Sequence, residues 1–190
     1  MDAVKASVSE TPADVQIDFE QDYFALFGLP LRFDLDESAL QHAWHGLQVQ
    51  VHPDRFAHLS EAHKRRSMQW ATHINEAFST LRKPVSRAVY LLGLAGVSCD
   101  LETNTAMSPA FLMEQMTWRE AVADARQARD GRALEAVHAE LNQTVRGMLG
   151  LLAQDFEKKE YSLAADRVRQ LMFVEKLQRE VNDALEVLES

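Results

Sequence analysis

The sequence has little of what holds small secreted domains together. Its 190 residues include a single cysteine, Cys99, which excludes an internal disulfide framework and a zinc site built on cysteines. We expect Cys99 to be a small apolar side chain that is buried or half-buried. Because one thiol suits a reducing compartment, we predict a cytoplasmic protein.

Long apolar runs and an excess of positive charge are also missing. The sequence has no stretch of 18 apolar residues, which argues against a membrane-spanning helix. A formal net charge of −9 argues against general binding to nucleic acid or to a membrane surface. The polar, acidic start of the chain lacks the features of a targeting signal, and we predict a disordered or loosely attached leader at 1–20.

Motifs typical of enzymes are absent too. The sequence contains no Gly-rich phosphate loop and no nucleophile motif. His42 and His45 are three residues apart in one predicted helix, but a metal site needs three or four converging ligands. We therefore predict no intrinsic enzyme activity, no cofactor and no bound metal. A metal-dependent enzyme is the alternative, and metal analysis of the purified protein tests it.

What the sequence does contain is uneven charge. Residues 1–39 hold 2 Lys and Arg against 9 Asp and Glu, and residues 40–90 hold 7 against 3. Residues 100–190 are acidic again, with 11 basic and 17 acidic residues. A basic segment between two acidic ones suggests two binding surfaces with different partners, unless the charges are simply solvated helix faces.

Helical periodicity runs through the whole chain after the leader. Apolar or small residues recur three or four positions apart in successive segments. The first half predicts a short helix within 22–30, a helix capped by Asp36 and ending near His52, a helix from Ser60 to Lys83, and a helix that starts at Pro84.

The second half repeats this pattern beyond a polar linker at 98–107. One helix is predicted from Ser108 to about Arg129, a second spans the apolar positions of 134–156, and a third is capped by Ser162 and runs to the end of the chain. Three amphipathic helices with short turns predict an antiparallel bundle at 108–190. The predicted fold class is all-α.

A short polar break interrupts the first half at Val51-His52-Pro53-Asp54-Arg55-Phe56. Proline disfavours helical geometry in the residue before it, so the preceding helix is expected to end near His52. An imidazole, a rigid ring and a carboxylate then share one exposed turn that presents them to a partner. An ordinary turn between helices is the alternative, because Pro and Asp are common there.

The first bundle helix has more apolar residues than one core stripe needs. At about 100° per residue, one arc faces the other helices and holds Phe111, Gln115, Trp118, Val122 and Ala125. A roughly opposite arc holds Leu112, Met113, Met116, Glu120 and Asp124. On the last helix Phe173 lies off the core stripe. Exposed apolar side chains grouped in this way indicate a partner site, unless the N-terminal domain covers them.

Four motifs carry a resemblance to a known family. They are Asp22-Tyr23-Phe24-Ala25-Leu26-Phe27-Gly28-Leu29-Pro30, the His52-Pro53-Asp54-Arg55-Phe56 turn, Tyr90-Leu91-Leu92, and Ala110-Phe111-Leu112-Met113-Glu114-Gln115-Met116. Helices flanking a His-Pro-Asp turn resemble a J domain, and the full set resembles the HscB co-chaperone family of iron–sulfur cluster assembly. The resemblance covers residues 22 to the end.

The resemblance implies a J domain at 21–97, including the connecting helix, that activates the ATPase of an HscA-type chaperone. It implies that the bundle at 108–190 binds an IscU-type scaffold protein, which is delivered to the chaperone. The chaperone-binding residues expected from the resemblance and the local charge are His52, Pro53, Asp54, Arg55, Lys64, Arg65 and Arg66. The implied scaffold-binding residues are Leu112, Met113, Met116, Glu120, Asp124 and Phe173.

The chain departs from the family pattern at a few positions. Arg55 stands where Lys is usual, and Val49 and Val51 stand where Arg and Tyr are usual, which leaves that helix with only His42 and His45 as basic candidates. Thr117 replaces a usual acidic residue, so one scaffold contact is in doubt. The alternative function keeps the J domain and gives the bundle a different client.

Overall fold

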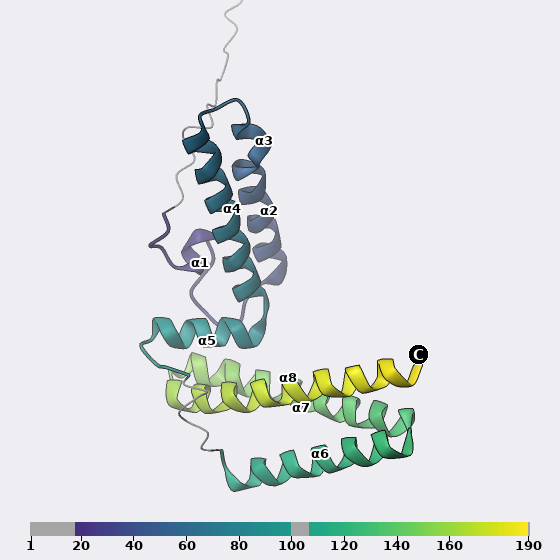
Figure 1. Ribbon diagram of the computed structural model, residues 1–190. Helices are drawn as coiled ribbons and strands as arrows, with labels where there is room; N and C mark the ends of the chain where they lie inside the picture. Colours follow the sequence, from purple (N-terminus) through teal and green to yellow (C-terminus); the bar gives the residue numbers. More distant parts are fainter. Residues whose placement is uncertain (1–17, 100–106, 190) are drawn as a thin grey trace, which may run out of the picture. The chain divides into compact units, whose positions relative to one another are not determined.

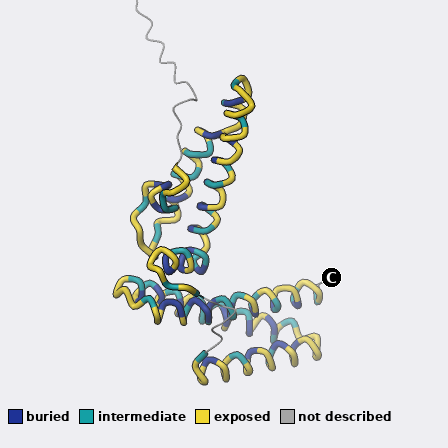
Figure 2. The backbone as a smooth tube through the Cα atoms, turned by 60° about the vertical axis from the view of Figure 1, so that its left-hand side comes forward, coloured by how far each residue is buried: buried dark blue, intermediate teal, exposed yellow. Residues whose placement is uncertain are grey.

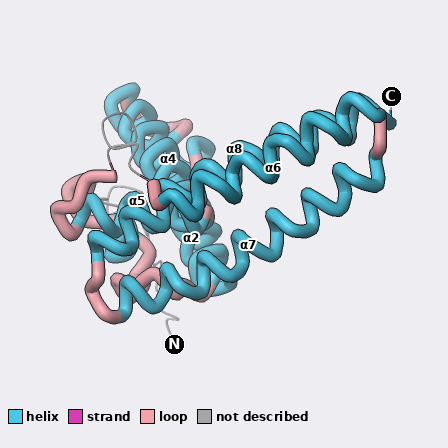
Figure 3. The backbone as a smooth tube through the Cα atoms, turned by 90° about the horizontal axis from the view of Figure 1, so that it is seen from below, coloured by secondary structure: helices cyan, strands magenta, loops and turns pink. Residues whose placement is uncertain are grey.

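The structure, a computed structural model, describes residues 18–99 and 107–189 (Figure 1). The predicted leader therefore lies outside the described residues up to position 17, as does most of the predicted linker. Within the described ranges every regular element is a helix (Figure 3), which confirms the all-α prediction. The helices are α1 Tyr23–Leu26, α2 Glu37–Val51, α3 Pro53–Phe56, α4 Glu61–Arg82, α5 Pro84–Leu94, α6 Pro109–Ala128, α7 Gly131–Glu157 and α8 Tyr161–Glu189.

Contacts divide the chain into two units. The N-terminal unit comprises Met1–Leu31 and Leu35–Lys83, and the C-terminal unit comprises Arg32–Asp34 and Pro84–Ser190. This division falls before α5, whereas the sequence placed that helix with the J domain and put the boundary at 98–107. The reason is packing: α5 contacts α8 and buries Val85, Ala88, Leu91 and Leu92.

In the N-terminal unit, α2 and α4 run side by side in opposite directions, and α1 packs against α4 (Figure 1). The Asp36 carboxylate accepts hydrogen bonds from the backbone N–H groups of Ser38 and Ala39, which confirms the predicted cap of α2. Across the helix pair, the Asn75 side-chain oxygen accepts from Trp44 Nε1 at 3.0 Å and from Gln48 Nε2 at 2.7 Å. These bonds fix the register of the two helices on their exposed side.

In the C-terminal unit, α6, α7 and α8 form the predicted antiparallel three-helix arrangement (Figure 1). Ser108 caps α6, and the turn to α7 passes through Arg129 in the left-handed region and the capping residue Asp130. The prediction that Ser162 caps the last helix was wrong, because α8 already begins at Tyr161. Buried apolar residues line the inner sides of these helices and exposed residues the outer sides (Figure 2).

One short segment joins the C-terminal unit from far along the chain. The Phe33 ring is buried and stacks on Phe156, with centroids 5.2 Å apart. The Arg87 guanidinium carbon lies 5.1 Å from the centroid of the same ring. The contacts of the Phe33 ring with Phe156 and Arg87 therefore hold Arg32–Asp34 in the C-terminal unit.

None of the helices in the described part of the chain combines the length and the apolar character that crossing a bilayer requires.

Candidate protein-docking sites

The His-Pro-Asp corner is held in place by a buried side chain on each side. Val51, the last residue of α2, and Phe56, the last residue of α3, are both almost completely buried. The Phe56 ring meets Trp70 of α4 edge-on at 6.1 Å. Because the chain is pinned before and after the corner, His52, Pro53 and Asp54 have a defined position and remain exposed.

The corner is a short helical turn rather than an irregular loop. Pro53 occupies the first position of α3, and His52 is its cap, with Nδ1 accepting from the Asp54 backbone N–H at 3.3 Å. Nδ1 also lies 3.6 Å from the Asp54 carboxylate. One nitrogen cannot accept from the N–H and donate to the carboxylate at once, so the two contacts exclude each other.

The Asp54 side chain is 90% exposed. A carboxylate with so few contacts inside the protein is able to accept a charge-assisted hydrogen bond from a cationic side chain of a partner. The same side chain lies in the first turn of α3.

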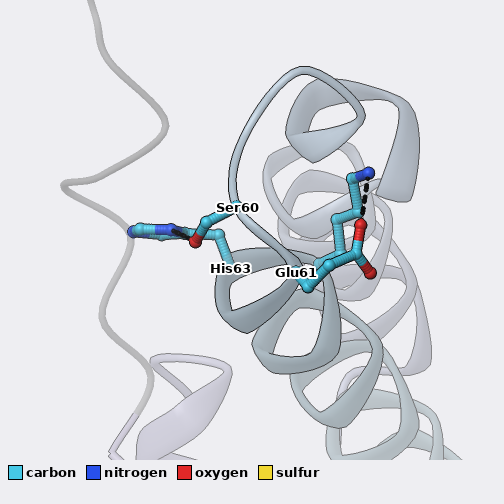
Figure 4. Close-up of polar contacts among 4 residues, drawn as sticks. Ser60, Glu61 and His63 are labelled. Atoms are coloured by element: carbon cyan, nitrogen blue, oxygen red, sulfur yellow. Dashed lines mark hydrogen bonds and ion pairs between the residues drawn. The ribbon is translucent and has the colours of Figure 1, made fainter.

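The basic residues near the corner differ in their ion pairing and in their burial. Lys64 Nζ contacts Glu61 Oε1 at 2.9 Å at the start of α4 (Figure 4). Arg55 is half-buried, whereas Arg65 and Arg66 are exposed. Two exposed guanidinium groups on α4 and an exposed carboxylate on α3, which contacts α4, give this unit exposed charges of both signs.

Ser60 occupies the predicted N-cap position of α4, but its side chain does not make the capping hydrogen bond. Ser60 precedes the helix with extended backbone and makes no side-chain cap bond to it. Its hydroxyl instead pairs with His63 Nδ1 at 2.8 Å (Figure 4).

The two departures from the family pattern in α2, Val49 and Val51, differ in their effect on the surface. Val51 is completely buried, so its side chain belongs to the core and the exchange from the family pattern does not alter the surface. Val49 is exposed and leaves an uncharged spot on the face of α2. Of the two basic candidates, His42 donates from Nδ1 to the Ser38 carbonyl at 2.7 Å, and His45 is exposed.

The two arcs predicted for α6 differ in burial as expected. Phe111, Trp118, Val122 and Ala125 are buried, and Gln115 is half-buried. The outer residues are exposed, and we call them the outer strip: Leu112, Met113, Met116, Glu120 and Asp124. Apolar side chains at the start of α6 therefore pass into carboxylates along the same face.

Two hydrogen bonds fix the orientation of α6. Trp118 Nε1 donates to Glu140 Oε1 on α7 at 2.8 Å, and Arg126 donates to the Glu180 carbonyl on α8 at 2.7 Å. Trp118 belongs to the inner arc and Arg126 directly follows its last residue, so both bonds hold the outer strip toward solvent.

Phe173 reaches α6 from α8. Its ring is half-buried and meets Phe111 edge-on with centroids 6.0 Å apart. The Arg119 guanidinium carbon lies 5.1 Å from the Phe173 centroid. The sequence prediction missed Arg119, although its position three residues after Met116 places it on the neighbouring line of the helix.

Thr117, the residue in doubt, is exposed, and its hydroxyl donates to the Met113 carbonyl within α6 at 3.2 Å. Cys99 is half-buried. Among the described residues, no group of three or more His, Cys, Asp or Glu side chains is placed to share a metal ion.

An all-helical protein with an exposed His-Pro-Asp corner belongs to the class of J-domain co-chaperones. A family model described as the HSCB C-terminal oligomerisation domain matches residues 107–182. A protein named co-chaperone protein HscB homolog, from an Azoarcus species, is 61% identical over 92% of this chain and 99% of its own length. The chain belongs to the HscB co-chaperone family.

Solved structures agree with this assignment. The chaperone HscB from Vibrio cholerae is 39% identical and superposes with a TM-score of 0.78 over 88% of this chain and 99% of its own. The human co-chaperone protein HscB is 28% identical, with a TM-score of 0.83 over 87% of this chain and 83% of its own.

Proposed function

We propose that this co-chaperone activates the ATPase of an HscA-type chaperone through its N-terminal unit and delivers an IscU-type iron–sulfur scaffold to it through α6–α8. The observation that carries the proposal is the presence of two exposed surfaces of different chemistry on separate units. The protein acts in the cytoplasm and catalyses no reaction itself. Its role is to couple two binding events.

At the corner, Asp54 is the residue that engages the chaperone. Its solvated carboxylate accepts a charge-assisted hydrogen bond from a basic group on the ATPase domain. His52 and Pro53 hold the turn in the bound shape before the encounter, which lowers the ordering cost of binding. Arg55, Lys64, Arg65 and Arg66 favour approach of an acidic chaperone surface and make the association rate depend on salt.

On α6 the outer strip binds the scaffold. Leu112, Met113 and Met116 supply apolar area, and Met suits a partner whose surface adapts. Phe173 adds a rigid ring at the edge of that area, with Arg119 beside it. Glu120 and Asp124 select a partner with complementary basic residues and orient it along the helix.

Binding both partners on one chain raises the concentration of scaffold next to the chaperone. This effective-concentration effect requires no new contact between them. It predicts that stimulation by scaffold and stimulation by this protein are more than additive at low concentrations.

The test is a steady-state ATPase assay of the HscA-type chaperone with scaffold, with this protein, and with both. We expect Asp54→Ala to fold normally and to bind scaffold with unchanged affinity. The same variant should bring the stimulated rate close to the basal rate, because the charge-assisted bond is lost. Asp183→Ala is the matched control, since it removes an exposed carboxylate from α8, and it should behave like the parent protein.

Normal stimulation by Asp54→Ala would refute the role of the corner. Normal stimulation combined with no detectable scaffold binding by the parent protein would support the alternative, in which the bundle carries a different client.

A further inference from the structure

Arg119 lies along the edge of the outer strip that faces α8, and the proposed function assigns it no partner. Around the axis of α6 it is about 20° from Leu112, whereas Glu120 and Asp124 are displaced by about 80° and about 120° in the opposite direction. The Arg119 guanidinium carbon lies 5.1 Å from the centroid of the Phe173 ring on α8. The outer strip therefore has a cation along one edge and two carboxylates along the other.

Within the described part of the chain, no carboxylate forms an ion pair with Arg119. Its neighbours three and four positions away on α6 are all uncharged: Gln115, Met116, Val122 and Ala123. The same positions around Phe173 on α8 also lack a carboxylate: Arg169, Gln170, Lys176 and Leu177. A cation–π contact does not use up the N–H groups of a guanidinium. The hydrogen-bond donors of this exposed side chain are therefore available to another molecule.

Arg126 shows how the same type of side chain serves the fold. It comes two helical turns after Arg119, on almost the same line of α6, and it donates to the Glu180 carbonyl on α8 at 2.7 Å. Arg119 also reaches α8, but its contact there is an aromatic ring, which accepts no conventional hydrogen bond. Arg126 therefore ties two helices together, whereas the N–H groups of Arg119 take no part in the packing of the bundle.

A scaffold bound to the outer strip would cover the Arg119 guanidinium. Leu112 and Met116 lie on one side of it and Phe173 on the other, and the proposed function assigns all three to the scaffold contact. A charge that loses its water without gaining a hydrogen-bond partner is strongly destabilising, so the scaffold must supply an acceptor there. A carboxylate fits best, because its two oxygens match the planar fork of a guanidinium and its charge is opposite.

We propose that Arg119 is a specificity-determining residue that pairs with a carboxylate of the IscU-type scaffold. The scaffold surface then has an acidic residue facing the α8 edge of the strip and basic residues facing Glu120 and Asp124. A scaffold turned around on the strip would bring like charges together, so the Arg119 pair fixes the orientation in which the scaffold binds. This inference rests on the proposed function.

Titration calorimetry with the IscU-type scaffold tests the pair. At low ionic strength we expect Arg119→Gln to weaken binding about fivefold and Arg119→Glu about twentyfold, because attraction is first lost and then becomes repulsion. The loss in Arg119→Glu should shrink to about threefold in 0.5 M salt, which screens the charges. Arg119→Lys should stay within about threefold of the parent, since it keeps the charge but not the planar fork. The control Arg132→Glu makes the same charge change at an exposed residue of α7 and should stay within about twofold.

A role limited to holding the Phe173 ring gives a different pattern. Arg119→Gln and Arg119→Glu would then weaken scaffold binding equally, and salt would not change either loss. That result would overturn the pairing. An equal loss in Arg132→Glu would overturn it as well, because total charge would then explain the effect.

A charge exchange identifies the scaffold residue. Each exposed Asp and Glu of the scaffold is changed in turn to Lys, and each variant is titrated with the parent protein and with Arg119→Glu. We expect one scaffold variant to bind the parent about tenfold more weakly than the unmodified scaffold does and to bind Arg119→Glu about tenfold more tightly. If no scaffold variant restores binding to Arg119→Glu, the acceptor is not a carboxylate and the proposal is wrong.

Failure of the proposed function gives a separate result. If the parent does not bind the scaffold, or if Leu112→Ser/Met116→Ser binds it as tightly as the parent does, the outer strip is not the scaffold site and both proposals fall. Binding that depends on Leu112 and Met116 but not on the charge at Arg119 overturns this inference alone.

Discussion

The His-Pro-Asp corner and the outer strip of α6 expose their residues in different ways. The corner is exposed because the backbone changes direction between Val51 and Phe56, which are both buried. The outer strip is exposed because its residues lie on the far side of a helix whose inner side is packed. A substitution in the corner therefore changes a single turn of defined geometry. Each substitution in the strip instead removes part of the exposed apolar area or one of its charges.

The largest effect expected in the strip is on scaffold affinity. Leu112→Ser/Met116→Ser removes the apolar part without touching the inner arc, and we expect about 100-fold weaker scaffold binding, because buried interface residues often contribute more than about 1.4 kcal/mol each. Titration calorimetry with the scaffold measures this change. Stimulation of the chaperone by this protein alone should persist.

The matched control is Leu151→Ser/Val187→Ser. Leu151 is 46% exposed against 44% for Leu112, and Val187 is 69% exposed against 62% for Met116. Both control residues lie outside the strip, so scaffold affinity should stay within about twofold of the parent. A comparable loss in both variants would mean that general surface hydrophobicity, rather than the strip, binds the scaffold.

The acidic half of the strip is expected to act more weakly and to depend on salt. Glu120→Lys/Asp124→Lys should lower scaffold affinity about tenfold at low ionic strength, because attraction to a basic partner becomes repulsion. The effect should shrink toward about twofold in 0.5 M salt, where screening acts over a few ångströms. Glu135→Lys/Asp183→Lys has the same net charge change outside the strip, and an equal loss there would point to total charge instead.

The next effect concerns the start of the helix that carries the strip. Ser108 Oγ accepts from the Phe111 backbone N–H at 3.3 Å, and Ser108→Ala should cost about 1 kcal/mol of unfolding free energy. Urea unfolding followed by circular dichroism measures it. Ser162→Ala is the control, because α8 begins before Ser162, and its midpoint should not move measurably.

The smallest effect concerns the uncharged spot on α2. Val49→Arg adds a positive charge at an exposed position on the same unit as the corner, and we expect about threefold tighter chaperone binding, mainly through faster association. Stopped-flow association at two salt concentrations checks this. Val49→Gln, which is polar and uncharged, should leave the association rate unchanged. If it accelerates binding equally, charge is not the cause.

Local signals in the sequence were enough to predict most of the fold. The three-four spacing located the long helices, and the caps at Asp36 and Ser108 were identified because the capping oxygen and the N–H groups that it accepts from are two or three residues apart. The inner and outer arcs of α6 followed from helical geometry alone. Each of these features depends on residues within one or two turns of each other.

Contacts between distant residues could not be predicted in this way. Phe33 has no periodic neighbours that link it to Phe156, and the packing of α5 on α8 depends on which apolar face finds a partner. The role of Arg119 beside Phe173 likewise joins two helices. At the corner, the sequence predicted an exposed turn, but the capping of α3 by the His52 ring requires a side-chain rotamer that sequence alone does not specify.

The insertion of Phe33 has a consequence for how this protein can be divided into its two units. The chain passes between the two units after Leu31, after Asp34 and again after Lys83. A gene segment ending at Lys83 would encode Phe33 without its contacts Phe156 and Arg87. A segment starting at Pro84 would encode Phe156 and Arg87 without the Phe33 ring that packs on them. Neither unit therefore keeps all of its own contacts when the chain is divided at Lys83.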